Sequence, residues 1–324
     1  MTLPMVVPDP SLPTQVTIWE VGPRDGLQNE SGVIDTATKV ELIDRLAGAG
    51  LGIVEATSFV RPDRVPQLAD AREVMAGIAR RDGVRYPVLV PNMRGLESAL
   101  DADVTDIAIF ASATETFAQR NLGRGYDAQW EMFAPVVSRA RAEGLCVRGY
   151  LSMCFGDPWE GAVPAEQVVT AVTRLRDLGC DAISLGDTIG VATPGQVADL
   201  VRRLVAVGVP IGEIGVHFHD TYGQALANTL SALREGVTTV DASAGGLGGC
   251  PYAKAATGNL ATEDLVYMLD GLGISHGVDL DALVSTSRWL AIRLGRPSPS
   301  RVVQARTPSE EKSRRSSDGS PSAQ

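Results

Sequence analysis

The chain has 324 residues, of which 44% are hydrophobic and 21% charged, a composition typical of soluble globular proteins with a sizeable core. Its formal net charge of −10 argues against nonspecific binding to nucleic acid or to an anionic membrane surface, and no apolar run is long enough to span a bilayer. An anionic ligand would therefore need a local basic patch.

Cysteine usage and the N-terminus bear on the compartment. The chain has 4 cysteines without CxxC spacing, which suits a reducing compartment better than a disulfide framework. Cys146 and Cys180 fall in apolar segments, so we expect them to be buried. Residues 1–13 carry no cationic segment followed by an apolar stretch, and we expect no signal peptide. These features predict a cytoplasmic protein.

The predicted elements alternate between strand and helix along the chain. A short β-rich run at 16–20 is followed by a turn and by a helical pattern over 36–49. The unit recurs, with strand-like runs at 52–56, 86–90, 105–110, 146–152, 182–185, 213–219 and 238–243. Helix-like segments lie near 66–81, 94–101, 127–143, 164–178, 194–207, 222–235 and 262–271.

Eight strand–helix units over about 250 residues predict a closed (β/α)₈ barrel, the TIM barrel, with right-handed connections. An open doubly wound sheet is the alternative, but it requires a glycine-rich phosphate-binding sequence that VGPRDG at 21–26 does not supply. The predicted organisation is an N-terminal extension (1–15), the barrel domain with an extra helix at 279–294 (16–296), and a Ser/Pro-rich tail (297–324). The tail has almost no large apolar residues, so we expect it to be disordered.

Polar residues fall at the C-terminal ends of the predicted strands, where such barrels build active sites. Asp25 follows the first strand, and His217 and His219 share one face at the end of the seventh. Asn259 follows the eighth, which closure places beside both. One carboxylate, two imidazoles and an amide oxygen predict a divalent metal site, and the lack of thiolate favours Mg²⁺ or Mn²⁺. The alternative is that the histidines only form hydrogen bonds at a strand end.

Other residues belong to the same ring. A lone acid in an apolar strand, such as Glu55, is costly unless paired, and Arg24 is its natural partner. Glu55 and Asp187 are also compatible with purely structural charge pairing. Cys250 lies at the tip of a glycine-dense loop that can approach a ligand closely or swing over it, unless it is an incidental thiol in a flexible turn.

Five segments resemble the family of 3-hydroxy-3-methylglutaryl-CoA lyases. They are VGPRDGLQNE at 21–30, SLGDTIG at 184–190, HFHDTYGQALAN at 217–228, GLGGCPY at 246–252 and GNLATED at 258–264. The resemblance runs from about residue 16 to residue 294. Isopropylmalate and homocitrate synthases, which are related, usually carry an acid where this chain has Leu27 and lack the cysteine loop, so both differences favour the lyases.

The resemblance implies a reaction and roles for single residues. The reaction would be a retro-Claisen cleavage of 3-hydroxy-3-methylglutaryl-CoA to acetyl-CoA and acetoacetate, with Mg²⁺ or Mn²⁺ held by Asp25, His217, His219 and Asn259. Arg24 would stabilise the enolate and Cys250 would help to protonate it, with His217 or a nearby acid such as Asp187 as the base. The expected catalytic residues are Cys250, Arg24, His217, Asp187 and Glu55, and the expected substrate-binding residues are Arg24, Glu20, Gln28, Tyr150, Arg148 and Thr188.

Alternatives to this activity remain. Within the same chemistry, they are a longer branched 3-hydroxyglutaryl-CoA as substrate, or a condensing synthase that joins an acyl-CoA and a 2-oxoacid. A scaffold protein without turnover is disfavoured by the intact site residues, and a metal hydrolase would show water attack without carbon–carbon cleavage. The expected partners are a small acyl-CoA and further copies of the chain, as a dimer or tetramer, with neither nucleic acid nor membrane.

Overall fold

A computed structural model describes residues 5–249 and 258–307 of the chain. Within these residues the strands form a parallel sheet in the order β2-β1-β9-β8-β7-β6-β5-β4-β3. The strands are β1 (Thr17–Glu20), β2 (Ile53–Val54), β3 (Thr57–Ser58), β4 (Val88–Leu89), β5 (Asp106–Ser112), β6 (Cys146–Ser152), β7 (Ala182–Asp187), β8 (Ile214–Phe218) and β9 (Thr239–Ala242).

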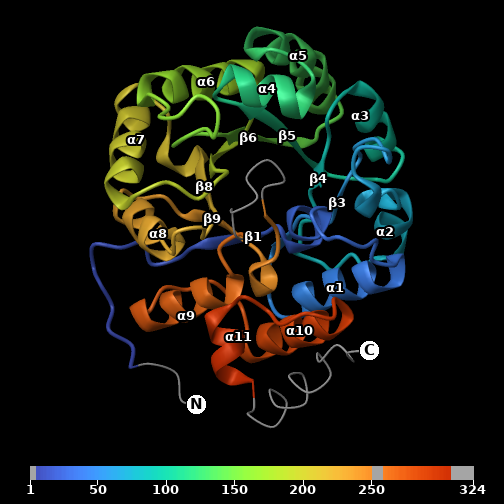
Figure 1. Cartoon of the computed structure of the whole chain (residues 1–324), viewed down its shortest axis with the longest axis vertical. Helices are drawn as coiled ribbons and strands as arrows, with labels where there is room; N and C mark the ends of the chain where they lie inside the picture. The colour runs from blue at the N-terminus through green and yellow to red at the C-terminus, as the bar shows by residue number, and fades with distance from the viewer. Residues whose placement is uncertain (1–4, 250–257, 308–324) are drawn as a thin grey trace, which may run out of the picture.

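The sheet closes on itself because β2 and β3 are two halves of one barrel strand. Between them, the N–H of Glu55 donates to the Glu20 carbonyl at 2.8 Å, and the N–H of Ala56 donates to the Pro87 carbonyl at 2.9 Å. Pairing thus passes from β1 to β4, while β1 also pairs with β9. The result is the predicted (β/α)₈ barrel, and Figure 1 shows its helices arranged around the strands.

Helices follow the strands largely as predicted, and local signals mark their starts. The Asp35 carboxylate accepts from the Thr38 N–H at 2.8 Å at the start of the first helix, and Pro194 opens the seventh behind a Thr193–Gln196 capping box. The fourth was not anticipated and lengthens the connection after β5. The helices are α1 (Thr36–Gly48), α2 (Ala71–Gly77), α3 (Met93–Leu100), α4 (Glu115–Leu122), α5 (Tyr126–Ala142), α6 (Ala165–Leu178), α7 (Pro194–Ala206), α8 (Ala225–Arg234), α9 (Thr262–Leu272) and the extra helix α10 (Leu280–Arg293).

The boundary of the tail differs from the expectation, because residues 297–307 are folded onto the barrel. Ser300 caps α11 (Arg301–Arg306) by accepting from the Val303 N–H at 3.2 Å, and its hydroxyl donates to Asp264 at 2.8 Å. Val303 is buried, and the Ser298 hydroxyl donates to the Gly245 carbonyl at 3.0 Å. These specific bonds anchor a segment that its low apolar content alone would leave unstructured. The remaining residues, 308–324, lie outside the described residues.

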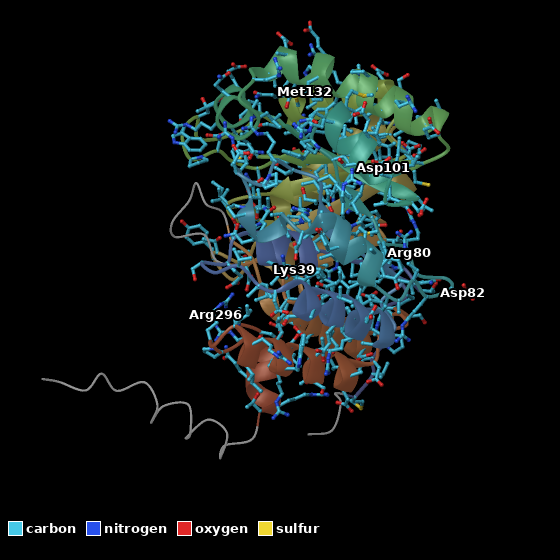
Figure 2. The ribbon with its side chains drawn as sticks, turned by 90° about the vertical axis from the view of Figure 1, so that its right-hand side faces the viewer. Lys39, Arg80, Asp82, Asp101, Met132 and Arg296 are labelled. Carbon is cyan, nitrogen blue, oxygen red and sulfur yellow. The ribbon has the colours of Figure 1, made fainter. Side chains whose placement is uncertain are left out.

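The two ends of the barrel face opposite sides in Figure 2. Arg80 and Asp82 lie on one side, in the connection that leads into β4. Arg296 lies on the other side, where it forms an ion pair with Glu30 in the segment after β1. The second side therefore carries the C-terminal ends of the strands. No helix among residues 5–249 and 258–307 combines the length and apolar composition needed to cross a membrane.

Candidate active site

The turn after β1 brings Arg24 and Asp25 to the C-terminal end of the barrel. This turn, η1 (Gly22–Gly26), is a single π-helical turn in which the N–H groups of Asp25 and Gly26 donate to the Val21 carbonyl at 2.7 and 3.1 Å. Pro23 suits its start because proline has no N–H to satisfy. Such π-turns are frequent at functional sites, and here the turn presents two adjacent charged side chains.

Asp25, His217 and His219 converge as predicted. One potential ligand atom from each lies within 4.8 Å of the others, and the two Nε2 atoms are 3.4 Å apart. Asn259 Nδ2 donates to Asp25 at 2.8 Å, whereas its Oδ1 is buried without a hydrogen-bond partner among the described residues. A buried oxygen without a partner fits a cation ligand, because leaving it unsatisfied is costly. We call these four residues the ligand group.

The carboxylate of the ligand group is ionised at neutral pH. Burial raises the pKa of Asp25, but the Arg24 guanidinium, together with His217 and His219 when they are protonated and the hydrogen bond from Asn259, lowers it to about 2. The Asp25 oxygens are therefore available to a divalent cation over the physiological pH range.

Behind His217 lies a buried acid that sequence reasoning missed. Asp241 faces His217 across β8 and β9, with its Oδ2 3.2 Å from His217 Nδ1. Burial raises the pKa of Asp241, but Arg148, which donates at 2.7 Å, lowers it below its usual value. Burial in turn lowers the pKa of His217, and the bond to Asp241 raises it above the ordinary value. The only signal was a lone acid within the predicted strand at 238–243, as for Glu55.

Arg24 forms the predicted ion pair with Glu55 and a second one with Asp25. Its Nε donates to Glu55 at 2.5 Å, and its Nη1 donates to Asp25 at 2.6 Å. The other Glu55 oxygen accepts from Trp19 Nε1 at 2.9 Å and from the Tyr150 hydroxyl. Arg24 also lies over the Tyr150 ring, 5.3 Å from its centroid. The guanidinium is thus fixed beside the ligand group by two carboxylates and an aromatic face.

Asp187, the last residue of β7, organises the loop that follows it. Its two carboxylate oxygens accept from the N–H groups of Val191 and Ala192, at 2.8 and 3.1 Å. Burial raises its pKa to about 6, although these hydrogen bonds and the charge of His217 act in the opposite direction. The carboxyl group can therefore exchange a proton near neutral pH.

Gln28 and Thr188 hold different parts of the site. Gln28 Nε2 donates to Asp25 at 3.1 Å, so it lies at the ligand group. Thr188 Oγ1 accepts from the Met153 N–H at 2.9 Å and joins the loops that follow β6 and β7.

Glu20, expected to bind substrate, instead lies behind the sheet. It follows Trp19, which reaches Glu55 inside the barrel, so its own side chain points outward. Glu20 Oε1 accepts from the N–H groups of Gly22 and Ala244, both at 2.8 Å, and its Oε2 accepts from Thr262 at 2.6 Å. Burial raises its pKa to about 7 despite these donors. Glu20 therefore joins two loops, and its side chain points away from the barrel interior.

Arg148 is likewise occupied away from the strand ends. Its guanidinium is paired with Asp241 and lies over the Trp19 ring, 4.1 Å from the centroid. The side chain is 3% exposed. Arg148 and Tyr150, two residues apart, share the inward face of β6, and Arg148 Nη1 donates to the Tyr150 hydroxyl at 3.3 Å. The structure thus places Arg148 beneath the ligand group, where it supports Asp241.

Cys250 lies outside the described residues, but the segment that leads to it is defined. Leu247 accepts from Asn259 Nδ2 at 3.0 Å, and Gly249 accepts from Asn29 Nδ2 at 2.7 Å. Gly248 has a φ of +112°, and a Cβ there would lie 2.5 Å from Asn259 Nδ2. The segment before Cys250 is thus packed directly against a member of the ligand group.

Comparison with known proteins identifies the family. The model of the HMGL-like family matches residues 15–290. The chain belongs to this family. The hydroxymethylglutaryl-CoA lyase of Bos taurus is 50% identical over 295 residues, which cover 91% of this chain and 90% of that protein. The resemblance read from the five sequence segments is therefore confirmed.

Two solved structures of HMGL-like proteins agree with the fold. The hydroxymethylglutaryl-CoA lyase of Pseudomonas aeruginosa is 48% identical, with a TM-score of 0.88, and the match covers 91% of this chain and 98% of that one. An HMG-CoA lyase of Acinetobacter baumannii, solved with coenzyme A and 3-methylmalate, is 36% identical, with a TM-score of 0.87 and coverage of 93% and 97%.

The HMGL-like relatives also correct the expected location. The bovine lyase is named as mitochondrial, which contradicts the cytoplasmic location predicted from the cysteines and the N-terminus. Cysteine usage of this kind suits a reducing compartment, but it does not distinguish one reducing compartment from another. The cysteines themselves are partly as expected: Cys180 is buried, but Cys146, at the start of β6, is exposed.

Gly248→Ala should disrupt the ligand group of this HMGL-like protein. The new Cβ would force Asn259 to move and would strain a positive φ, so we expect Mn²⁺ affinity to fall about tenfold or more, as for lost support of a metal ligand. Titration of Mn²⁺ measures this. Gly83→Ala is the matched control, because Gly83 has a φ of +78° but open space around its Cβ position. Equal affinities in both variants would contradict the prediction.

Proposed function

We propose that the protein is a divalent-metal-dependent carbon–carbon lyase that cleaves 3-hydroxy-3-methylglutaryl-CoA to acetyl-CoA and acetoacetate. The observation that carries this is the position of Asp25, which lies between two imidazoles and the Arg24 guanidinium. A candidate cation site therefore lies next to the fixed positive charge of Arg24. The named lyase relatives support the substrate, and the coenzyme A complex of the Acinetobacter relative supports an acyl-CoA.

Asp25, His217, His219 and Asn259 would hold Mg²⁺ or Mn²⁺. The donor set fits, because it offers a carboxylate, imidazoles and the buried Asn259 Oδ1 that lacks a hydrogen-bond partner among the described residues. When bound, the ion supplies Lewis acidity that lowers the pKa of the substrate hydroxyl.

Asp187 takes the hydroxyl proton in this proposal. His217 is less suited, because its Nδ1 faces Asp241 and its Nε2 faces the ligand group, so neither nitrogen is free. Asp187 has a pKa of about 6 and retains lone pairs beyond those used by Val191 and Ala192. As the proton leaves, the hydroxyl oxygen becomes a carbonyl, the carbon–carbon bond breaks, and its electron pair passes to the thioester as an enolate.

Arg24 stabilises that enolate, and Cys250 protonates it. The bonds of Arg24 to Glu55 and Asp25 use Nε and Nη1, so Nη2 is the atom we assign to the enolate oxygen. Glu55 and Tyr150 fix the guanidinium in place without any need to touch the substrate. The Cys250 thiol gives its proton to the enolate carbon, which completes acetyl-CoA. The thiolate is then reprotonated from solvent, and Asp187 releases to solvent the proton that it took from the hydroxyl group.

Asp187→Asn should abolish the acidic limb of the pH–rate profile. A base must be deprotonated, so kcat of the parent protein should fall as the pH drops through about 6, the pKa to which burial raises Asp187. The variant should be at least about 10²-fold slower, the usual contribution of a general base, with no inflection in this range. Steady-state rates from pH 5 to 9 provide the measurement, and an unchanged inflection in the variant would rule out Asp187 as the base.

Cys250→Ala should lose most turnover and still bind Mn²⁺, because the thiol is not in the ligand group. In the parent protein, Cys250 should alkylate faster than Cys146 and be protected by a bound product analogue. Cys146 is an exposed comparator whose pKa is raised by partial burial and by Asp106. Peptide mapping after brief alkylation gives both rates. Normal turnover by Cys250→Ala would exclude the proton-donor role.

The direct test mixes purified protein, Mg²⁺ and 3-hydroxy-3-methylglutaryl-CoA and analyses the products by mass spectrometry. Acetoacetate and acetyl-CoA support the proposal. Free 3-hydroxy-3-methylglutarate with coenzyme A would indicate a hydrolase. If the protein does not turn over this substrate but cleaves a longer branched homologue, the proposed reaction stands and the homologue is the substrate.

A further inference from the structure

We infer that Asp241 is a positioning residue that sets the tautomer of His217 and thereby the metal affinity of the ligand group. The inference rests on the proposed metal function. Asp241 lies on β9, is 2% exposed, and is 3.2 Å from His217 Nδ1 on β8. Asp241 is not a member of the ligand group, but it contacts His217, which is one.

The contacts of Asp241 determine where the proton of His217 resides. Its Oδ1 accepts from Arg148 at 2.7 Å, and its Oδ2 accepts from Ser184 at 2.9 Å. An ionised carboxylate only accepts hydrogen bonds, so the Nδ1 that faces it carries the imidazole proton. The lone pair of neutral His217 is then on Nε2, the atom that lies 3.4 Å from His219 Nε2. That lone pair is what a metal requires.

Arg148 keeps this arrangement rigid and charged. The guanidinium is buried between the Trp19 and Tyr150 rings, 4.1 and 5.0 Å from their centroids. Because it comes from β6, on the far side of β7, it fixes Asp241 independently of the loops at the barrel end. Arg148, Asp241 and His217 therefore form a chain of contacts that passes through the barrel interior to the ligand group.

Arg148 and His217 contact different oxygens of Asp241, so the orientation of an asparagine at this position can be predicted. Arg148 can only donate, so the amide oxygen of the new asparagine should stay at the Oδ1 position, and the amide NH₂ should then face His217 Nδ1. Nδ1 must become an acceptor, which moves the proton to Nε2 and blocks the metal. We expect Mn²⁺ affinity to fall about 10- to 100-fold, the usual effect of losing such a partner.

The measurements are Mn²⁺ titration by calorimetry or electron paramagnetic resonance, and ¹⁵N chemical shifts of the histidine rings, which distinguish Nδ1–H from Nε2–H. Asp106→Asn is the matched control. Asp106 is a buried strand acid, paired with Arg85, at the start of β5 and thus at the opposite end of the barrel. It should lose stability without changing Mn²⁺ affinity or the tautomer of His217.

Weaker Mn²⁺ binding with an Nε2–H tautomer in Asp241→Asn, and parental values in Asp106→Asn, support the inference. Parental affinity and tautomer in Asp241→Asn overturn it and leave the proposed lyase function intact. If Asp241→Asn does not fold, the metal-free parent protein decides, since an Nε2–H tautomer of His217 there also overturns the inference. A parent protein that binds no Mn²⁺ would refute both the metal function and this inference.

Discussion

Replacement of Arg24 by glutamine should lower kcat by about 10²- to 10³-fold, the scale of losing a donor to a developing oxyanion. KM should change much less, because the charge that Arg24 opposes exists only as the carbon–carbon bond breaks. Rates at saturating substrate and saturating Mg²⁺ measure this effect. A parental kcat with a raised KM would make Arg24 a binding residue.

Stability must be separated from catalysis in this variant. Glu55 is fully buried, and without Arg24 its remaining side-chain partners within residues 5–249 and 258–307 would be Trp19 and Tyr150. Breaking a buried ion pair by removing one partner costs about 3–5 kcal/mol of unfolding free energy. Arg24→Gln combined with Glu55→Gln removes the uncompensated charge, so it should recover part of the stability and none of the lost kcat. Recovery of kcat in the double variant would contradict the enolate role.

Removal of divalent metal should reduce turnover to background. Chelator-treated protein is expected to regain activity with Mg²⁺ or Mn²⁺ and to unfold at a higher temperature when the ion is restored. Binding to the folded state alone adds about 2.7 kcal/mol to the unfolding free energy at 100 times Kd. Elemental analysis, activity and thermal unfolding are the measurements. Full activity in chelator without bound metal would eliminate the site.

The chain offers a matched pair of histidines for this experiment. His219→Gln removes a member of the ligand group and should abolish metal-dependent stabilisation. His276 lies instead beside Asp270, with 3.0 Å between His276 Nε2 and the carboxylate, near the end of α9. His276→Gln should keep the stabilisation by Mn²⁺, whatever its effect on basal stability. Loss of metal stabilisation in both variants would argue against a specific role for His219.

Much of the ligand group could be predicted from the sequence, since its geometry depends on local rules. His217 and His219 are two residues apart on a strand, which places them on one face. Asn259 follows β9, which pairs with that strand, and Asp25 follows β1, which barrel closure places on the other side of β9. These inferences need only the strand boundaries and the direction of the chain.

Contacts that cross the barrel could not be predicted in the same way. Arg148 and Asp241 are 93 residues apart, and neither the spacing nor the residue types indicate which acid faces which base. The expected orientation of Glu20 was wrong for a different reason. A shift of one residue along β1 moves a side chain from the inside of the barrel to the outside. Trp19, rather than Glu20, occupies the inward position and reaches Glu55.

The folded part of the tail could not be predicted from composition. The low average hydrophobicity of a Ser-rich segment does not reveal the contacts of single residues. Here Ser298 and Ser300 bind defined partners, and Val303 is buried. A few side-chain bonds to Gly245 and Asp264 are enough to order this segment once the barrel exists.

The position of Glu20 has a consequence for how this protein tolerates change. One of its oxygens is shared by the backbone that begins the Asp25 turn and the backbone that leads toward Asn259. The spacing of the ligand group is therefore set partly from the rear of β1, on the face of this strand that points away from the barrel interior. Harmful substitutions should accordingly fall in two separate regions, one around the mouth and one behind this strand. A substitution behind β1 could inactivate the protein without changing any side chain at the mouth of the barrel.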